Sequence, residues 1–103
     1  MPEDPDFDYR SIDEIIHGRV RLAVMAFLSG AGTAPFGELQ RHAQVSEGNL
    51  SVHLRKLEDA GYVEAEKRFV NRKPQTLYHL TEAGRSAWIA YIAHMQKLLH
   101  PDG

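Results

Sequence analysis

Apolar side chains recur at helical spacing in the first part of the chain and again in three later stretches. From Ile12 to Leu28 they cover an arc of roughly 200° on a helical wheel, about twice the width that a surface helix needs. This pattern predicts a helix that contacts both its own core and a second surface. We expect Ser11 to cap this helix and the Ser-Gly-Ala-Gly sequence at 29–32 to end it.

The following stretch is shorter and leads into another long helix. Residues 33–36 have the character of a short strand, and residues 37–43 that of a small helix. After a turn at 44–45, Ser46 is expected to cap a helix over 47–60. The inward face of this helix carries leucines at helical spacing: Leu50, Leu54 and Leu57.

After this helix, the spacing of apolar residues changes from helical to alternating. Residues 62–70 and 76–80 predict two strands, and the proline-containing stretch 71–75 between them predicts a turn. Together they form a β-hairpin. Thr81 is expected to cap a last helix that runs to about Leu99.

The order of these elements predicts the fold class. It is mainly α with a small β-hairpin (α+β), a winged helix-turn-helix with one extra helix at each end. With 103 residues, the chain supplies a single core. We expect an acidic flexible tail over 1–10 and one domain over 11–100, which includes dimerisation helices at both ends.

Composition excludes several classes of function. The chain has no cysteine, which removes disulfide scaffolds, thiolate metal sites and cysteine nucleophiles. It has no apolar run long enough for a membrane span and no signal-peptide pattern, so we expect a cytoplasmic protein without a membrane partner. No nucleophile–base set, phosphate loop or paired carboxylates suggest catalysis, so we expect neither an enzyme nor a cofactor.

Charge is informative through its distribution. The net charge of −2 argues against nucleic acid, yet the hairpin brings together Lys67, Arg68, Arg72 and Lys73 without an acid between them. Binding to a polyanion depends on such a local patch. In this layout the helix over 47–60 can enter the major groove, and the basic wing over 67–75 can reach the backbone or the minor groove. A solvated hairpin tip is the alternative interpretation.

Two stretches resemble a known family. The sequence VSEGNLSVHLRKLEDAGYV from Val45 to Val63 is similar to the recognition-helix signature of winged-helix transcriptional regulators of the MarR/ArsR type. The sequence YHLTEAGR from Tyr78 to Arg85 is similar to the strand-to-helix join of the same group. The resemblance implies a dimeric transcription factor. The missing cysteines and the spacing of His94 and His100 argue against metal sensing at the family's sites, and a small-molecule effector stays open.

The candidate DNA contacts follow from this layout. In the helix and its cap they are Ser46, Glu47, Gly48, Asn49, Ser51, Val52, Arg55 and Lys56. In the wing they are Arg68, Asn71, Arg72 and Lys73, and alternation directs only one of Lys67 and Arg68 to the DNA. We expect Asn49 to read adenine and Val52 to touch a thymine methyl. Glu47 either accepts from cytosine or interacts with the helix dipole, and Arg55 and Lys56 hold phosphates.

Three other polar residues are given structural roles. His53 lies near the leucine stripe, which favours a packed histidine over a base contact. Asp13 and His17 share a helix face, which favours a surface ion pair over two ligands of a metal ion. We therefore expect no metal site.

The first and last helices carry more apolar residues than a small core needs. Each buried large side chain stabilises by about 1.5–3 kcal/mol, so a dimer seam is expected there. Its candidate residues are Ile12, Ile15, Leu22, Trp88, Tyr91, Ile92, Met95, Leu98 and Leu99.

The sequence thus predicts a homodimeric regulator that binds double-stranded DNA at specific sequences, and we expect a repressor that occludes a promoter. The alternative is a winged-helix module that binds protein and not DNA. The cationic run in the hairpin favours the first interpretation.

Overall fold

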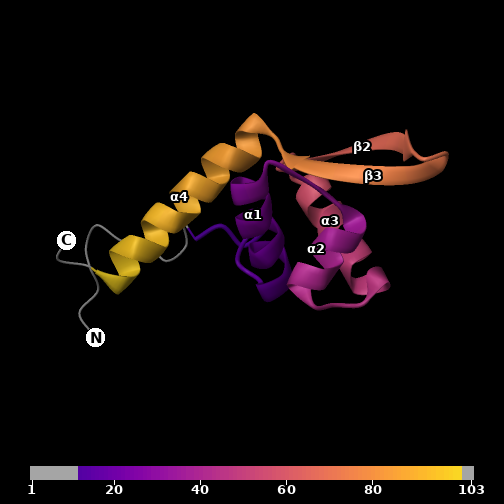
Figure 1. Cartoon of the computed structure of the whole chain (residues 1–103). Coiled ribbons are helices and arrows are strands. Elements are labelled where there is room, and N and C mark those ends of the chain that lie inside the picture. The colour runs from indigo at the N-terminus through magenta and orange to yellow at the C-terminus, as the bar shows by residue number, and fades with distance from the viewer. Residues whose placement is uncertain (1–11, 101–103) are drawn as a thin grey trace.

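The computed structural model describes residues 12–100. The elements follow in the order α1 (Arg19–Ala31), β1 (Thr33–Pro35), α2 (Phe36–Ala43), α3 (Glu47–Asp59), β2 (Val63–Val70), β3 (Lys73–Leu80) and α4 (Glu82–Leu99). The hairpin of β2 and β3, here called the wing, extends past α3, and α4 runs toward the opposite end of the molecule (Figure 1). The predicted winged-helix fold is confirmed. In the described part, no helix is long and apolar enough to cross a membrane.

The first helix begins later than predicted. α1 starts at Arg19 after an extended Gly18, and the residues from Glu14 to Ile16 form a turn. The cause is Asp13, whose Oδ1 accepts hydrogen bonds from the backbone N–H groups of Ile15 (2.8 Å) and Ile16 (3.3 Å). A short acidic side chain that bonds the nearby backbone competes with a continuous helix. The predicted cap, residue 11, lies outside the described residues.

Asp13 also connects the segment before α1 to the base of the wing. Its Oδ2 accepts a hydrogen bond from the hydroxyl of Tyr62 at 2.5 Å. This bond, together with burial, raises the pKa of Tyr62 to about 12. His17 has a different partner, because its Nδ1 lies 2.8 Å from the hydroxyl of Tyr91 in α4. The structure thus gives these two side chains other partners in place of the predicted ion pair.

The three strands form one antiparallel sheet in the order β1-β3-β2. The wing turns through two residues, Asn71 and Arg72, which both have a positive φ. This is the geometry of a tight two-residue hairpin. The longer predicted turn is therefore wrong, because Pro74 lies in β3 and pairs with Phe69. Since β1 pairs only with residues 77–79, β3 has a free edge at this point and tolerates a residue without an N–H.

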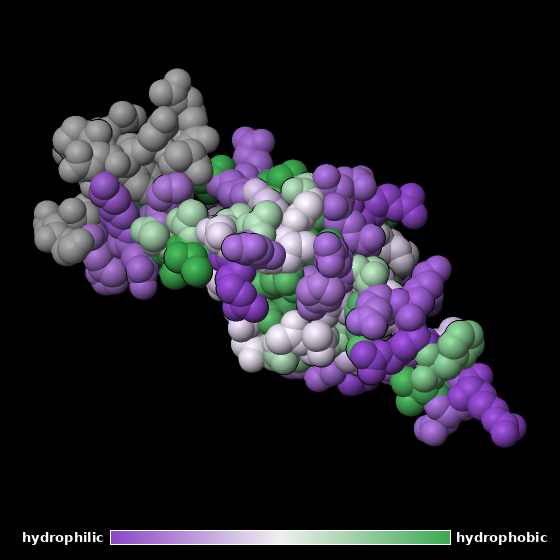
Figure 2. Space-filling model, turned by 90° about the horizontal axis from the view of Figure 1, so that it is seen from above, coloured by the Kyte–Doolittle hydropathy of each residue, from purple (hydrophilic) through white to green (hydrophobic). Residues whose placement is uncertain are grey.

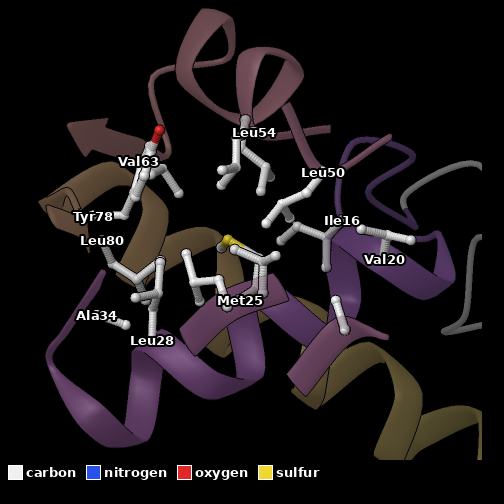
Figure 3. Close-up of a cluster of buried hydrophobic side chains, with 14 of the residues drawn as sticks. Ile16, Val20, Met25, Leu28, Ala34, Leu50, Leu54, Val63, Tyr78 and Leu80 are labelled. Atoms are coloured by element: carbon white, nitrogen blue, oxygen red, sulfur yellow. The ribbon is translucent and has the colours of Figure 1, made fainter. Parts of the chain in front are cut away.

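One core joins the helices to the sheet (Figure 3). Leu50, Leu54 and Leu57 of α3 are at most 1% exposed, as their spacing predicted. They pack in a cluster with residues from the turn before α1, from α1 and from the sheet, which include Ile16, Met25, Leu28, Val63 and Leu80. Among residues 12–100, no polar or charged side chain is buried in this core.

The start of α4 is held tightly against the segment between α3 and the wing. Thr81 caps the helix as predicted, because its hydroxyl oxygen accepts from the backbone N–H of Gly84 at 2.9 Å. The backbone N–H of Thr81 donates to the carbonyl oxygen of Tyr62 at 3.0 Å. A Cβ on Gly84 would lie only 2.0 Å from the same oxygen. Only glycine fits this crossing, since backbone atoms cannot move aside as a flexible side chain can.

We expect Gly84→Ala to lower the free energy of unfolding by about 3 kcal/mol, at the upper end of the usual cost of overpacking. Gly30→Ala is the matched control, because a Cβ on Gly30 in α1 would meet no other atom within 4 Å. The free energy of unfolding of Gly30→Ala should be about 0.5–1 kcal/mol higher than that of the wild type, because the unfolded chain has less backbone entropy. Urea denaturation measures both changes. Equal stability of Gly84→Ala and the wild type would contradict the tight crossing.

Candidate nucleic-acid interface

The outer face of α3 is open to solvent over its whole length. The side-chain oxygen of Ser46 accepts from the backbone N–H of Asn49 at 3.2 Å, so Ser46 is the N-cap that was predicted. The predicted contact residues of this helix and its cap are all exposed: Ser46, Glu47, Gly48, Asn49, Ser51, Val52, Arg55 and Lys56. Burial of the leucine face leaves these side chains available to a ligand.

A shallow hollow lies along the same face. It has a volume of about 400 Å³ and is lined by Ser51, Val52, Arg55, Lys56 and Asp59. The side chain of Val52 is 55% exposed in the middle of this helix, where an apolar group gains nothing from the chain's own core. Asp59 was not among the predicted residues. Its carboxylate marks the end of the face where a phosphate would be repelled.

Strand pairing in the wing shows which of Lys67 and Arg68 lies on the face of the sheet that packs against α3. In an antiparallel sheet, paired residues lie on one face and neighbours along a strand on opposite faces. Lys67 therefore shares the face of the buried Val63, against which α3 packs, and Arg68 lies on the other face with Gln75. Of the two side chains that alternation left open, Lys67 is on the α3 side, and Arg68 is directed away from it.

The tip of the wing carries an unusual backbone conformation. Arg72 has φ of +66° and Asn71 of +52°. Asparagine tolerates this left-handed region, so the structure gives Asn71 a role in the turn. An arginine at such a position is disfavoured relative to glycine. Both residues, and Lys73 after them, are exposed.

A second hollow joins elements that are distant in the sequence. It has a volume of about 500 Å³ and lies between the start of α2 and the wing, lined by Pro35, Phe36, Gly37, Glu38, Arg41, Pro74, Gln75 and Thr76. The sequence pattern places Arg41 on α2 but does not reveal this hollow, because no local pattern indicates that α2 and β3 meet. Glu38 lines it beside Arg41, so its charge is mixed.

His53 is packed, as predicted. Its Nδ1 lies 2.8 Å from Nη1 of Arg21, and because a guanidinium only donates, Nδ1 must be unprotonated. The Nε of Arg21 also donates to the carbonyl oxygen of Ile15 at 2.5 Å. Burial lowers the pKa of His53, and nearby cations, with Arg21 the strongest, lower it further. The neutral imidazole thus connects α3 to α1 and to the segment before it.

The candidate dimer residues fall into three groups. Tyr91 is only 4% exposed, so its ring belongs to the core of its own chain and not to an open face. Six others are partly buried against that core: Ile12, Ile15, Leu22, Trp88, Ile92 and Met95. Leu98 and Leu99 are 39% and 71% exposed, and Ile89, which was not among the predicted residues, is 63% exposed. The open apolar surface of α4 is therefore mainly at its C-terminal end.

The described part of the chain offers no other obvious chemistry. Within residues 12–100 there is no group of three or more His, Cys, Asp or Glu side chains placed to hold a metal ion. His79 contacts Glu64 across the two strands of the wing, with Nε2 and Oε2 at 3.2 Å. Both side chains are partly exposed and pair with each other, which is typical of a cross-strand pair.

Comparison with known proteins gives a consistent result. A family model described as a winged helix DNA-binding domain matches residues 20–99. An uncharacterised protein of Methanocaldococcus jannaschii is 33% identical over 85 residues, which span 82% of this chain and 92% of that protein.

Solved structures are also similar. A transcriptional regulator homologue from Pyrococcus horikoshii OT3 has a TM-score of 0.80 and 29% identity, with 86% of this chain and 88% of that chain covered. A MarR-family transcriptional regulator from Silicibacter pomeroyi has a TM-score of 0.66 and 25% identity, with 89% of this chain and 61% of that chain covered.

The contact between His53 and Arg21 predicts a pH dependence of stability. Because the pKa of His53 is lower in the folded chain than its ordinary 6.5, the unfolded chain binds the proton more readily. The stability that neutral His53 contributes is complete above pH 6.5. It is lost as the pH falls from there toward the pKa of His53 in the folded chain. In His53→Asn an amide oxygen accepts from Arg21 without titrating. We expect this variant to lose less stability between about pH 7.5 and 5.0 than the wild type, as measured by urea denaturation. Equal losses would contradict this role.

Proposed function

The chain belongs to the winged helix DNA-binding domain family, and on this premise we propose that it is a transcriptional regulator that binds double-stranded DNA at specific sequences. In this proposal α3 enters the major groove and the wing contacts the backbone or the minor groove. The observation that carries it is the exposure of every candidate residue on the outer face of α3, beside a wing whose residues 67–80 contain no acid.

The chemistry of the exposed face of α3 supports base readout. Asn49 lies in the first turn of the helix, the part that reaches base edges in this motif, and an amide forms two hydrogen bonds with adenine. Val52 offers an apolar surface to a thymine methyl. Arg55 and Lys56 are exposed further along and are suited to phosphates.

The wing supplies the second set of contacts. We assign a backbone contact to Lys67 in place of Arg68, because Lys67 shares the face that packs on α3. Arg72 occupies a position where glycine is favoured, which costs stability. A residue kept in a disfavoured conformation at an exposed tip is well explained by a functional side chain. We therefore give Arg72 the main wing contact.

A homodimer completes the proposal. The exposed leucines at the C-terminal end of α4 form an apolar surface far from the wing, and a second copy would cover it (Figure 1). Two α3 helices about 34 Å apart would then read a near-palindromic site. Binding of such a dimer across a promoter would exclude the polymerase, so we propose repression by occlusion.

The DNA-binding experiment is fluorescence anisotropy with labelled duplex from upstream of the protein's own coding sequence, compared with a scrambled duplex at several salt concentrations. Specific binding should weaken linearly in log affinity against log salt. Asn49→Ala should lose about 1–3 kcal/mol of binding free energy on the specific duplex and none on the scrambled one. Arg72→Ala should weaken binding to both duplexes and lower the slope of log affinity against log salt by about 1. Arg85→Ala is the matched control, because it removes an exposed charge from α4.

Absence of binding to any duplex at low salt would contradict the DNA-binding proposal. The winged-helix protein-interaction module would then become the better explanation. If the protein binds both duplexes equally and Asn49→Ala changes neither affinity, sequence specificity is contradicted. Contacts to the DNA backbone would then explain the binding.

The dimer is tested by changing Leu98 and Leu99 together to glutamate. Neither side chain is buried in its own chain, so the variant should fold and become a monomer by light scattering. Ala83→Glu with Ser86→Glu is the matched control, since both are exposed near the start of the same helix. It should stay dimeric. A dimeric Leu98/Leu99 variant would place the seam elsewhere.

A further inference from the structure

The most exposed large apolar side chain of the described residues is at the wing. Phe69 is the next-to-last residue of β2, and 78% of its surface is open to solvent. Figure 2 shows a hydrophobic group near the end of the projecting hairpin with hydrophilic side chains around it. A phenylalanine in this place contributes nothing to the core of the chain, so its apolar surface is available to a partner.

The strand register assigns Phe69 to a particular face. It pairs with Pro74 and lies two residues after Lys67, so it shares the face of Lys67 and of the buried Val63. This is the side of the sheet on which α3 packs. The aromatic ring therefore belongs to the same side of the molecule as the proposed recognition helix.

The paired strands place one charged side chain on this face, the cation of Lys67. The acids of β2, Glu64 and Glu66, alternate onto the opposite face, where Glu64 contacts His79. Lys67 precedes the phenylalanine on the α3 side, and Arg72 follows it in the turn at the tip. An aromatic group between cations, with no carboxylate on its face of the strand, is complementary to a polyanion that also offers apolar surface.

The position of Phe69 at the narrow end of the wing suits the minor groove. A groove about 6 Å wide is too narrow for a whole two-stranded ribbon but admits single side chains beside a two-residue turn. Apolar side chains that enter this groove insert between base steps, unstack them in part and bend the duplex, while flanking cations hold the phosphates. Arg72 and Lys67 are placed to serve as those cations.

We propose that Phe69 is an apolar wedge that the wing inserts into the minor groove, where it bends the DNA. The inference rests on the proposed DNA-binding function and adds to it a bend and a preference for flexible base steps beside the α3 half-site. Pyrimidine–purine steps unstack most readily, so a TA or CA step at the wing position should be favoured.

The test compares Phe69→Ala with Val70→Ala on the specific duplex. Val70 is the matched control, because it is an exposed apolar neighbour on the opposite face of the wing. Anisotropy gives affinity and salt slope, and energy transfer between dyes at the duplex ends gives bending. Phe69→Ala should bind about tenfold more weakly with an unchanged salt slope, since no phosphate contact is lost, and should bend the duplex less. Val70→Ala should match the wild type.

Two further measurements sharpen the result. Phe69→Leu keeps an apolar side chain and should retain most of the bend. Phe69→Trp should show altered indole emission on binding DNA, because the ring stacks on a base. If Phe69→Ala binds and bends the duplex as strongly as the wild type does, the wedge is overturned and the proposed function stays intact. Failure of the wild type to bind any duplex would overturn both, and an apolar wing would then fit a protein partner.

Discussion

Burial of one face of α3 sets the orientation of this helix in the molecule. Leu50, Leu54 and Leu57 are almost completely enclosed by residues of α1 and the sheet, so the helix cannot rotate about its axis without exposing them. The opposite face must then be the exposed one, and its polar, small and cationic side chains are presented in a single fixed array. The proposed readout of bases follows from this orientation, because a helix free to rotate would present no consistent set of side chains to a groove.

A second constraint is located around Tyr62, between α3 and the wing. Its carbonyl oxygen accepts from Thr81 and blocks any side chain at position 84, and its hydroxyl donates to Asp13. The base of the wing, the start of α4 and the segment before α1 therefore meet at one residue. In a dimer assembled through α4, this rigid junction would transmit the geometry of the seam to the distance between the two recognition helices.

Among residues 12–100, four of the six exposed large apolar side chains lie toward the two ends of an elongated molecule, whose longest dimension is 58 Å. Phe69 and Val70 are the last two residues of β2, and Leu98 and Leu99 the last two of α4. The tip of the wing and the end of α4 point in opposite directions (Figure 1). The core is complete without these side chains, since its members are already buried within one chain. Their separation is consistent with two different partners, a groove of DNA at one end and a second protomer at the other.

Sequence alone predicts the order of the elements, the caps at Ser46 and Thr81, the inward leucines of α3 and the exposed set around Asn49. These features depend on periodicity and on hydrogen bonds between near neighbours, which local sequence encodes. The folded chain adds that Asp13 bonds Tyr62, that Tyr91 joins the core, and that Lys67 and Phe69 share the side of α3. Those outcomes depend on strand register and on contacts between residues far apart in the chain, and no local pattern specifies them.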